Sequence, residues 1–224
     1  MKKILFVLIL ISISLIGVSC VSASQDTNIS DVKGEAVSNF AVNKDISAGT
    51  FDELQNEIDS AKYELNLTRD YTASKGNTVK IVAGSNFETL HSRGDWYFGN
   101  GFKYFTINGN GHTIDCNNKF NAFDVDLKEN WNSITIKNVR FINGDNKDGK
   151  GGAVTVINGD MVEFINCTFE NNKAKNGGAI SINNDGELRI INCTFINNIA
   201  DDKGGAIYKD EGKMHISFFR CQYM

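Results

Sequence analysis

The 224-residue chain contains no proline, three histidines and five cysteines, and its 27 acidic residues outnumber its 23 basic ones. His91, His112 and His215 share no metal-ligand spacing and no Cys-x-x-Cys pair occurs, so we predict no metal or cofactor site. The acidic balance argues against nucleic acid or anionic lipid as a partner.

The chain also lacks a long apolar run. The longest, residues 4 to 18, is shorter than the roughly 20 residues of a membrane span. It follows two lysines and precedes small residues that end at Ala23, a pattern that predicts a signal peptide over residues 1 to 23. A lipoprotein signal at Cys20 is the alternative, although Gly17 stands where a large aliphatic residue is expected. We expect a secreted or cell-surface protein.

Repetition is what the chain has in abundance. A Gly-Gly-Ala-Val/Ile motif begins at Gly151, Gly177 and Gly204, and an Ile-Asn-Cys-Thr-Phe motif begins at Ile165 and Ile191. The spacings are 26 or 27 residues. A fixed period of this size is typical of stacked supersecondary units, each of which buries its apolar face against its neighbours.

The pattern inside one repeat identifies the unit. Between residues 187 and 196 two sets of side chains alternate with a period of two, which is typical of β-strands, and residues 180 to 182 form another short strand. Turns rich in asparagine and glycine separate them. Three short strands in 26 residues leave no room for a helix. We therefore predict an all-β fold, a right-handed parallel β-helix whose coils stack about 4.8 Å apart.

Asparagine occurs 28 times and recurs in register with the motifs. Two series lie five residues apart: Asn138, Asn166 and Asn192, then Asn143, Asn171 and Asn197. Stacked amides can bond to one another because each donates and accepts, and we favour such a ladder for the first series. For the second series a ladder and ordinary turn asparagines remain equal alternatives. Burial of the first series in its bend would close the sequons at Asn166 and Asn192 to glycosylation.

The alternation of Gly-Gly-Ala-Ile at residues 177 to 180 with Phe-x-Asn-Asn at residues 195 to 198 resembles two known repeats. One belongs to polymorphic outer-membrane proteins, the other to archaeal adhesin-like surface proteins. The clear repeat covers residues 134 to 221, and residues 105 to 115 resemble a more divergent coil. The resemblance implies a right-handed parallel β-helix, surface exposure and adhesion, and it carries no catalytic motif.

The N-terminal part of the mature chain is expected to hold a spacer and a cap. Residues 24 to 48 are small and polar, which predicts a disordered spacer. A capping box predicts a short helix over residues 50 to 61. Its apolar face would cover the open end of a β-helix domain at residues 49 to 224, with regular coils from about 105 to 224. Residues 95 to 98, rich in aromatics, are predicted to cover the early coils, with sugar stacking as the alternative.

Val139, Cys167 and Cys193 align at one inward position. We predict reduced, buried thiols there, because free cysteine behaves as a small hydrophobic residue. A disulfide between the two cysteines is the alternative for an exported protein. The coil spacing is, however, longer than the roughly 3.5–4.5 Å between bridged Cβ atoms.

Parallel β-helices also carry polysaccharide lyases and glycoside hydrolases, so a pectate-lyase-like enzyme is the alternative function. Such a site needs carboxylates stacked on one outward strand face. The face after the Gly-Gly corner is predicted to present Thr155, Ser181 and Tyr208, and the acids are predicted to lie singly in turns. We expect a non-catalytic, adhesin-like domain, with no catalytic residue, whose partner is a carbohydrate or protein on another cell surface.

The last coil departs from the repeat pattern before Met224. We expect a chain truncated at its C-terminus, with an apolar edge at Phe218, Phe219 and Tyr223. Such an edge favours self-association through the open coil.

Overall fold

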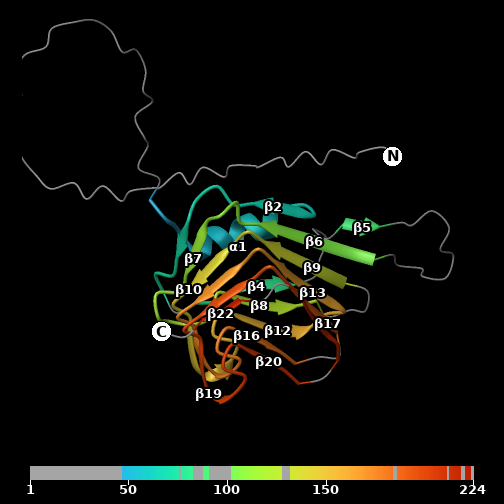
Figure 1. The fold of residues 1–224 in the computed structure, drawn as a ribbon. Helices are drawn as coiled ribbons and strands as arrows, with labels where there is room; N and C mark the ends of the chain where they lie inside the picture. The colour runs from blue at the N-terminus through green and yellow to red at the C-terminus, as the bar shows by residue number, and fades with distance from the viewer. Residues whose placement is uncertain are drawn as a thin grey trace, which may run out of the picture. The chain divides into compact units, whose positions relative to one another are not determined.

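The computed structural model describes residues 47–75, 77–82, 88–90, 102–127, 132–183, 186–210, 212–217 and 220–222. The predicted signal peptide, most of the predicted spacer, the aromatic segment at 95–98 and the apolar residues 218, 219 and 223 lie outside this part. The described chain forms stacked parallel sheets with a single short helix (Figure 1). This β-solenoid confirms the predicted parallel β-helix.

Successive coils share three sheets, which they pass through in the same order, and the strands of these sheets pair with their equivalents in the neighbouring coils. The first sheet contains β2 (Glu64–Asn66), β6 (Phe102–Asn108), β9 (Asn132–Lys137), β13 (Met161–Ile165), β17 (Glu187–Ile191) and β21 (Met214–Ser217), and β5 (Glu88–Leu90) pairs antiparallel with β6. The second sheet contains β1 (Gly49–Thr50), β3 (Tyr71–Thr72), β7 (Thr113–Asp115), β10 (Arg140–Ile142), β14 (Thr168–Glu170), β18 (Thr194–Ile196) and β22 (Arg220–Gln222).

The structure adds a fourth strand to the three predicted for each repeat. The expected third strand forms a sheet of β4 (Val79–Val82), β8 (Phe123–Asp126), β12 (Val154–Asn158), β16 (Ile180–Ile182) and β20 (Ile207–Lys209). In the later coils an additional strand precedes the strand of this third sheet. These additional strands form a fourth sheet: β11 (Asp145–Lys150), β15 (Lys173–Asn176) and β19 (Ile199–Lys203). Their sequences are rich in Lys and Asp and lack alternation, so period-two analysis did not detect them.

In the core, side chains at equivalent positions of successive coils stack on one another. Phe141, Phe169 and Phe195 are fully buried and lie in register, with ring centroids 5.1 and 4.8 Å apart and planes inclined by only 12°. The adjacent Thr168 and Thr194 face outward and are half-buried. The predicted inward and outward faces are therefore confirmed. Each phenylalanine contributes about 1.5–3 kcal/mol by burial.

Helix α1 (Phe51–Ser60) covers the first coil, as predicted. Thr50 and Glu53 form the capping box, and Phe51, Leu54 and Ile58 point into the core. The backbone hydrogen bond from Thr50 lowers the pKa of Glu53. Both ends of the helix match the predicted span within one residue.

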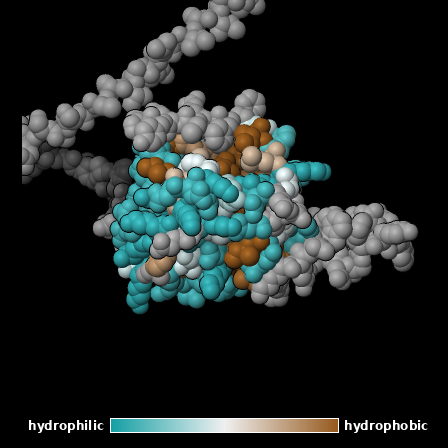
Figure 2. Space-filling view, turned by 90° about the horizontal axis from the view of Figure 1, so that it is seen from below, coloured by the Kyte–Doolittle hydropathy of each residue, from teal (hydrophilic) through white to brown (hydrophobic). Residues whose placement is uncertain are grey.

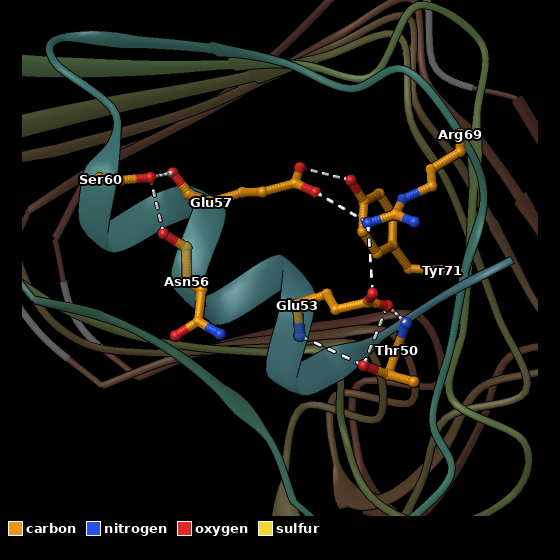
Figure 3. Close-up of polar contacts among 7 residues, drawn as sticks. All are labelled: Thr50, Glu53, Asn56, Glu57, Ser60, Arg69 and Tyr71. Carbon is orange, nitrogen blue, oxygen red and sulfur yellow. Dashed lines mark hydrogen bonds and ion pairs between the residues drawn. The ribbon is translucent and has the colours of Figure 1, made fainter.

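Polar contacts fasten α1 to the coil beneath it (Figure 3). The buried Tyr71 hydroxyl donates to Glu57, and Arg69 lies 3.2 Å from the same carboxylate and 3.7 Å from Glu53. Gln55 completes the cap, since its amide donates to the carbonyl of Lys80 at 2.9 Å and accepts from that residue's N–H at 2.7 Å. A side chain thus takes the place of a missing strand along the edge of β4.

The surface at the far end of the stack is mostly hydrophilic, with separate hydrophobic patches (Figure 2). Met214 and Ile216 of β21 are 50% and 42% exposed. Their register partners one coil earlier, Leu188 and Ile190, are fully buried. The same inward position is therefore covered in one coil and open in the next.

Candidate functional site

A polar groove lies at the bend between the first and second sheets. It has a volume of about 410 Å³ and is lined by Asn110, Gly111, Asn138, Val139, Arg140, Asn166 and Thr168. This volume lies within the range of about 300–1,000 Å³ that is usual for small-molecule sites. Three successive coils supply the lining, so the groove exists only in the stacked fold. The sequence analysis predicted no site residue, and every residue of the groove is an addition from the structure.

A two-residue insertion forms the wall of the groove. Two residues, 138 and 139, join β9 to β10, whereas four, 109 to 112, join β6 to β7. The flanking strands nevertheless stay in register. The extra residues, Asn110 at φ +51° and Gly111 at φ +86°, form a turn of their own. Because the bend of the next coil has no residues to match them, this turn overhangs it.

A ladder of asparagine side chains forms one side of the groove. Each Nδ2 donates to the Oδ1 of the preceding coil: Asn108 to Asn66 at 3.0 Å, Asn138 to Asn108 at 3.0 Å, Asn166 to Asn138 at 3.3 Å and Asn192 to Asn166 at 2.7 Å. The last three also have left-handed backbone, with φ of 57°, 53° and 51°. The predicted ladder is confirmed, and it extends two coils further toward the N-terminus.

The expected burial of this ladder is wrong. Asn166 and Asn192 are exposed, because the bend turns their side chains outward and sends only the next residue, Cys167 or Cys193, into the core. Their amide nitrogens still each donate to a neighbouring rung. Resistance of the two sequons to glycosylation stays a prediction, and it now depends on that hydrogen bond instead of on burial.

Charged groups beside the groove neutralise each other. Arg140 on β10 donates to Glu170 on β14 at 2.5 Å, and the two side chains are 43% and 24% exposed. At this exposure the pair adds at most about 1 kcal/mol to stability, so its clearer effect is to orient the guanidinium. Thr168, the register partner of Arg140, adds a hydroxyl group to the lining.

A second amide ladder, which the sequence analysis did not predict, lies inside the next bend. Asn172 is fully buried; its Oδ1 accepts from the Gly144 N–H at 2.9 Å, and its Nδ2 donates to the Phe141 carbonyl at 3.2 Å and to Asn198 Oδ1 at 2.9 Å. The residues one position earlier are turn residues with φ of 55°, 55° and 51°: Asn143, Asn171 and Asn197. The doubled asparagine was the available signal, because one member makes the turn and the other makes the ladder.

The strand face after the Gly-Gly corner is closed, contrary to the prediction that it points outward and open. Ser181 is 0% and Thr155 9% exposed. The turn that begins at Gly151 lies against this face, and the Thr155 hydroxyl donates to the Lys150 carbonyl. Of the three predicted residues only Tyr208 reaches solvent, and its hydroxyl donates to Asp210 at 2.7 Å.

The inward cysteines are reduced, as predicted. Cys167 and Cys193 are buried and unbridged, and the Cys193 sulfur lies 3.4 Å from the Cys167 backbone nitrogen. Cys116 is buried and unbridged as well. Burial raises the pKa of the Cys116 and Cys167 thiols. Neither is suited to act as a nucleophile, because the thiolate is the reactive form.

Within the described residues no cluster of three or more His, Cys, Asp or Glu side chains could hold a metal ion. Some acids predicted in turns lie in strands instead: Asp145 in β11, and Asp201 and Asp202 in β19. The cause is the unpredicted fourth sheet. In the described part of the chain, no helix combines the length and apolarity needed to cross a membrane.

Comparison with protein families matches the described coils to one repeat. Residues 166–183 and 192–209 match the Chlamydia polymorphic membrane protein repeat. Each match begins at an asparagine of the first ladder, Asn166 or Asn192, and continues through the second and fourth sheets to the strand after the Gly-Gly corner. Curated proteins and solved structures gave no match. Two consecutive coils of this β-solenoid are therefore similar to the polymorphic membrane protein repeat, while the archaeal part of the resemblance stays a prediction.

Proposed function

We propose that this chain is a surface-displayed, non-catalytic β-solenoid that binds a carbohydrate or protein of another cell. The match of two coils to a polymorphic membrane protein repeat carries the proposal. The location of the repeat residues supports the proposal, because most of the residues that define the repeat lie inside the solenoid: Gly178, Phe169 and Asn172 are buried. The repeat thus builds a scaffold, and binding falls to outward residues that differ from coil to coil.

Two measurements test this proposal. Antibodies against residues 49–224 should label intact, unpermeabilised source cells, and beads coated with the full chain should adhere to cultured cells more than beads coated with heat-denatured chain. Labelling only after permeabilisation would contradict surface display. Turnover of an acidic or neutral polysaccharide, abolished by changing a single acid, would replace the binding function with the lyase or hydrolase alternative.

A further inference from the structure

We infer that the groove at the asparagine ladder binds a neutral oligosaccharide, with one or two sugar units lying across the bends of three coils. The inference deepens the proposed function and rests on it, since it names the ligand class of a binding protein. Its starting observation is the overhanging turn at Asn110 and Gly111, which turns a row of bends into a groove of about 410 Å³.

The amides in the groove are held ready for a ligand with many hydroxyl groups. An asparagine amide has two N–H donors and an oxygen with two lone pairs. The ladder uses one donor and one lone pair of Asn138 and of Asn166, which leaves one of each on both residues. Because the ladder already fixes the amide planes, little side-chain entropy is lost when a ligand binds. Strand stacking places the two rungs about 4.8 Å apart.

The balance of charge in the groove favours a neutral ligand. Arg140 is the only lining residue with a formal charge, and Glu170 compensates it at 2.5 Å. A carboxylate or sulfate would have to compete with Glu170, and an ammonium group would lie beside a guanidinium. Sugar hydroxyls can instead accept from Arg140 and donate to the amide oxygens without disturbing the pair.

The apolar area of the lining is too small for a lipid or an aromatic ligand. Val139 is the one aliphatic side chain in it, and that side chain is only 2% exposed. The remaining surface consists of amides, a hydroxyl group, a guanidinium and the backbone of Gly111, where an added Cβ would meet no atom of the described residues within 4 Å. A lining of amides and a guanidinium, with almost no exposed apolar side chain, is better suited to the vicinal hydroxyl groups of a sugar than to a hydrocarbon surface.

Binding can be mapped on the full chain, labelled with ¹⁵N, by titration with cellobiose, maltose, lactose and N,N′-diacetylchitobiose. At least one should shift the side-chain NH₂ signals of Asn138 and Asn166, the Nε–H signal of Arg140 and the Gly111 amide. Digalacturonate serves as the charged comparison and should bind more weakly. Shifts confined to other parts of the chain, or tighter binding of digalacturonate than of every neutral sugar, would overturn the assignment.

Thr168→Tyr fills the groove, and Thr194→Tyr is its matched control. The two threonines are register partners on adjacent strands and are both half-buried, but only Thr168 lines the groove. We expect the first variant to weaken disaccharide binding about tenfold, equivalent to about 1.4 kcal/mol, and the second to change it less than about twofold. Both should keep the wild-type backbone spectrum. Equal losses in the two variants would show that the groove is not the site.

Glu170→Gln changes the charge of the groove without changing its shape. The substitution leaves Arg140 without its carboxylate partner, so the ratio of digalacturonate affinity to neutral-sugar affinity should rise about tenfold. An unchanged ratio would contradict the role assigned to the ion pair. If the chain bound none of the disaccharides but still mediated cell adhesion, this inference would be overturned and the proposed function would stand. If the chain bound a disaccharide but showed neither surface display nor adhesion, the proposed function would be overturned and the groove assignment would stand.

Discussion

Truncating Asn172 should destabilise the solenoid far more than changing its exposed neighbour Asn171. Asn172→Ala leaves the Gly144 N–H without its partner in a buried bend, and it removes one of the donors to the Phe141 carbonyl, which stays in the ladder between β10 and β14. An orphaned buried N–H costs about 1–3 kcal/mol, so we expect a loss of that size. Asn198 keeps a donor, because the Asn172 backbone N–H still reaches its Oδ1 at 3.1 Å.

Urea unfolding followed by far-ultraviolet circular dichroism measures this loss as a shift of the midpoint at constant slope. Asn171→Gly is the matched control: residue 171 is exposed, and glycine accepts its φ of +55° without strain, so its midpoint should stay close to wild type. Asn172→Asp offers a pH readout, because a carboxylate facing two oxygens is stable only when protonated, and the loss should grow above about pH 4. Equal midpoints for Asn172→Ala and Asn171→Gly would refute the buried ladder.

Three further outcomes are expected. Phe195→Ala should cost about 3–5 kcal/mol in urea unfolding, against less than about 0.5 for Thr194→Ala, and equal costs would mean that the inward and outward faces are misassigned. Burial, and then the hydrogen bond to a glutamate, raise the pKa of Tyr71 to about 12, so the folded state keeps a proton that the unfolded chain loses near pH 10. Stability should therefore be complete below about pH 10 and fall between about pH 10 and 12, and Tyr71→Phe should abolish this fall. We also propose that residues 24–224 self-associate through the last described coil, and that a Met214→Lys, Ile216→Lys double variant should reduce this in sedimentation velocity; a wild-type monomer at high concentration would contradict it.

The sequence predicted the features that one repeat contains and missed those that depend on how two coils meet. The alternation across β17 and β18 identified the inward set, including Leu188 in the first strand and Phe195 in the second, because a period of two has a direct structural meaning. The groove could not be anticipated in the same way. Its wall is only an insertion of two residues, and their effect appears when the register shows that the adjacent bend is shorter.

The amide ladders show the same limit at the scale of a single residue. Asn138 and Asn166 could be recognised because each stands alone at its bend. At the following bend two asparagines compete for one buried position, and the sequence does not say which of Asn171 and Asn172 faces inward. Backbone geometry decides it, since the residue in the left-handed region must point its side chain outward.

The need for glycine at the second position of a Gly-Gly corner comes from the next coil, which packs against it. A Cβ on Gly152 would lie 2.1 Å from the Gly178 carbonyl oxygen, and one on Gly178 would lie 2.1 Å from that of Gly205. Among the described residues, a Cβ on Gly205 would have no neighbouring atom within 4 Å. Gly205→Ala is thus silent while that corner is free and becomes a steric block as soon as any coil, from this chain or another, stacks on it. The Gly205→Ala variant therefore reports whether a further coil packs on this corner, because its methyl group is accommodated without such a coil and clashes with one.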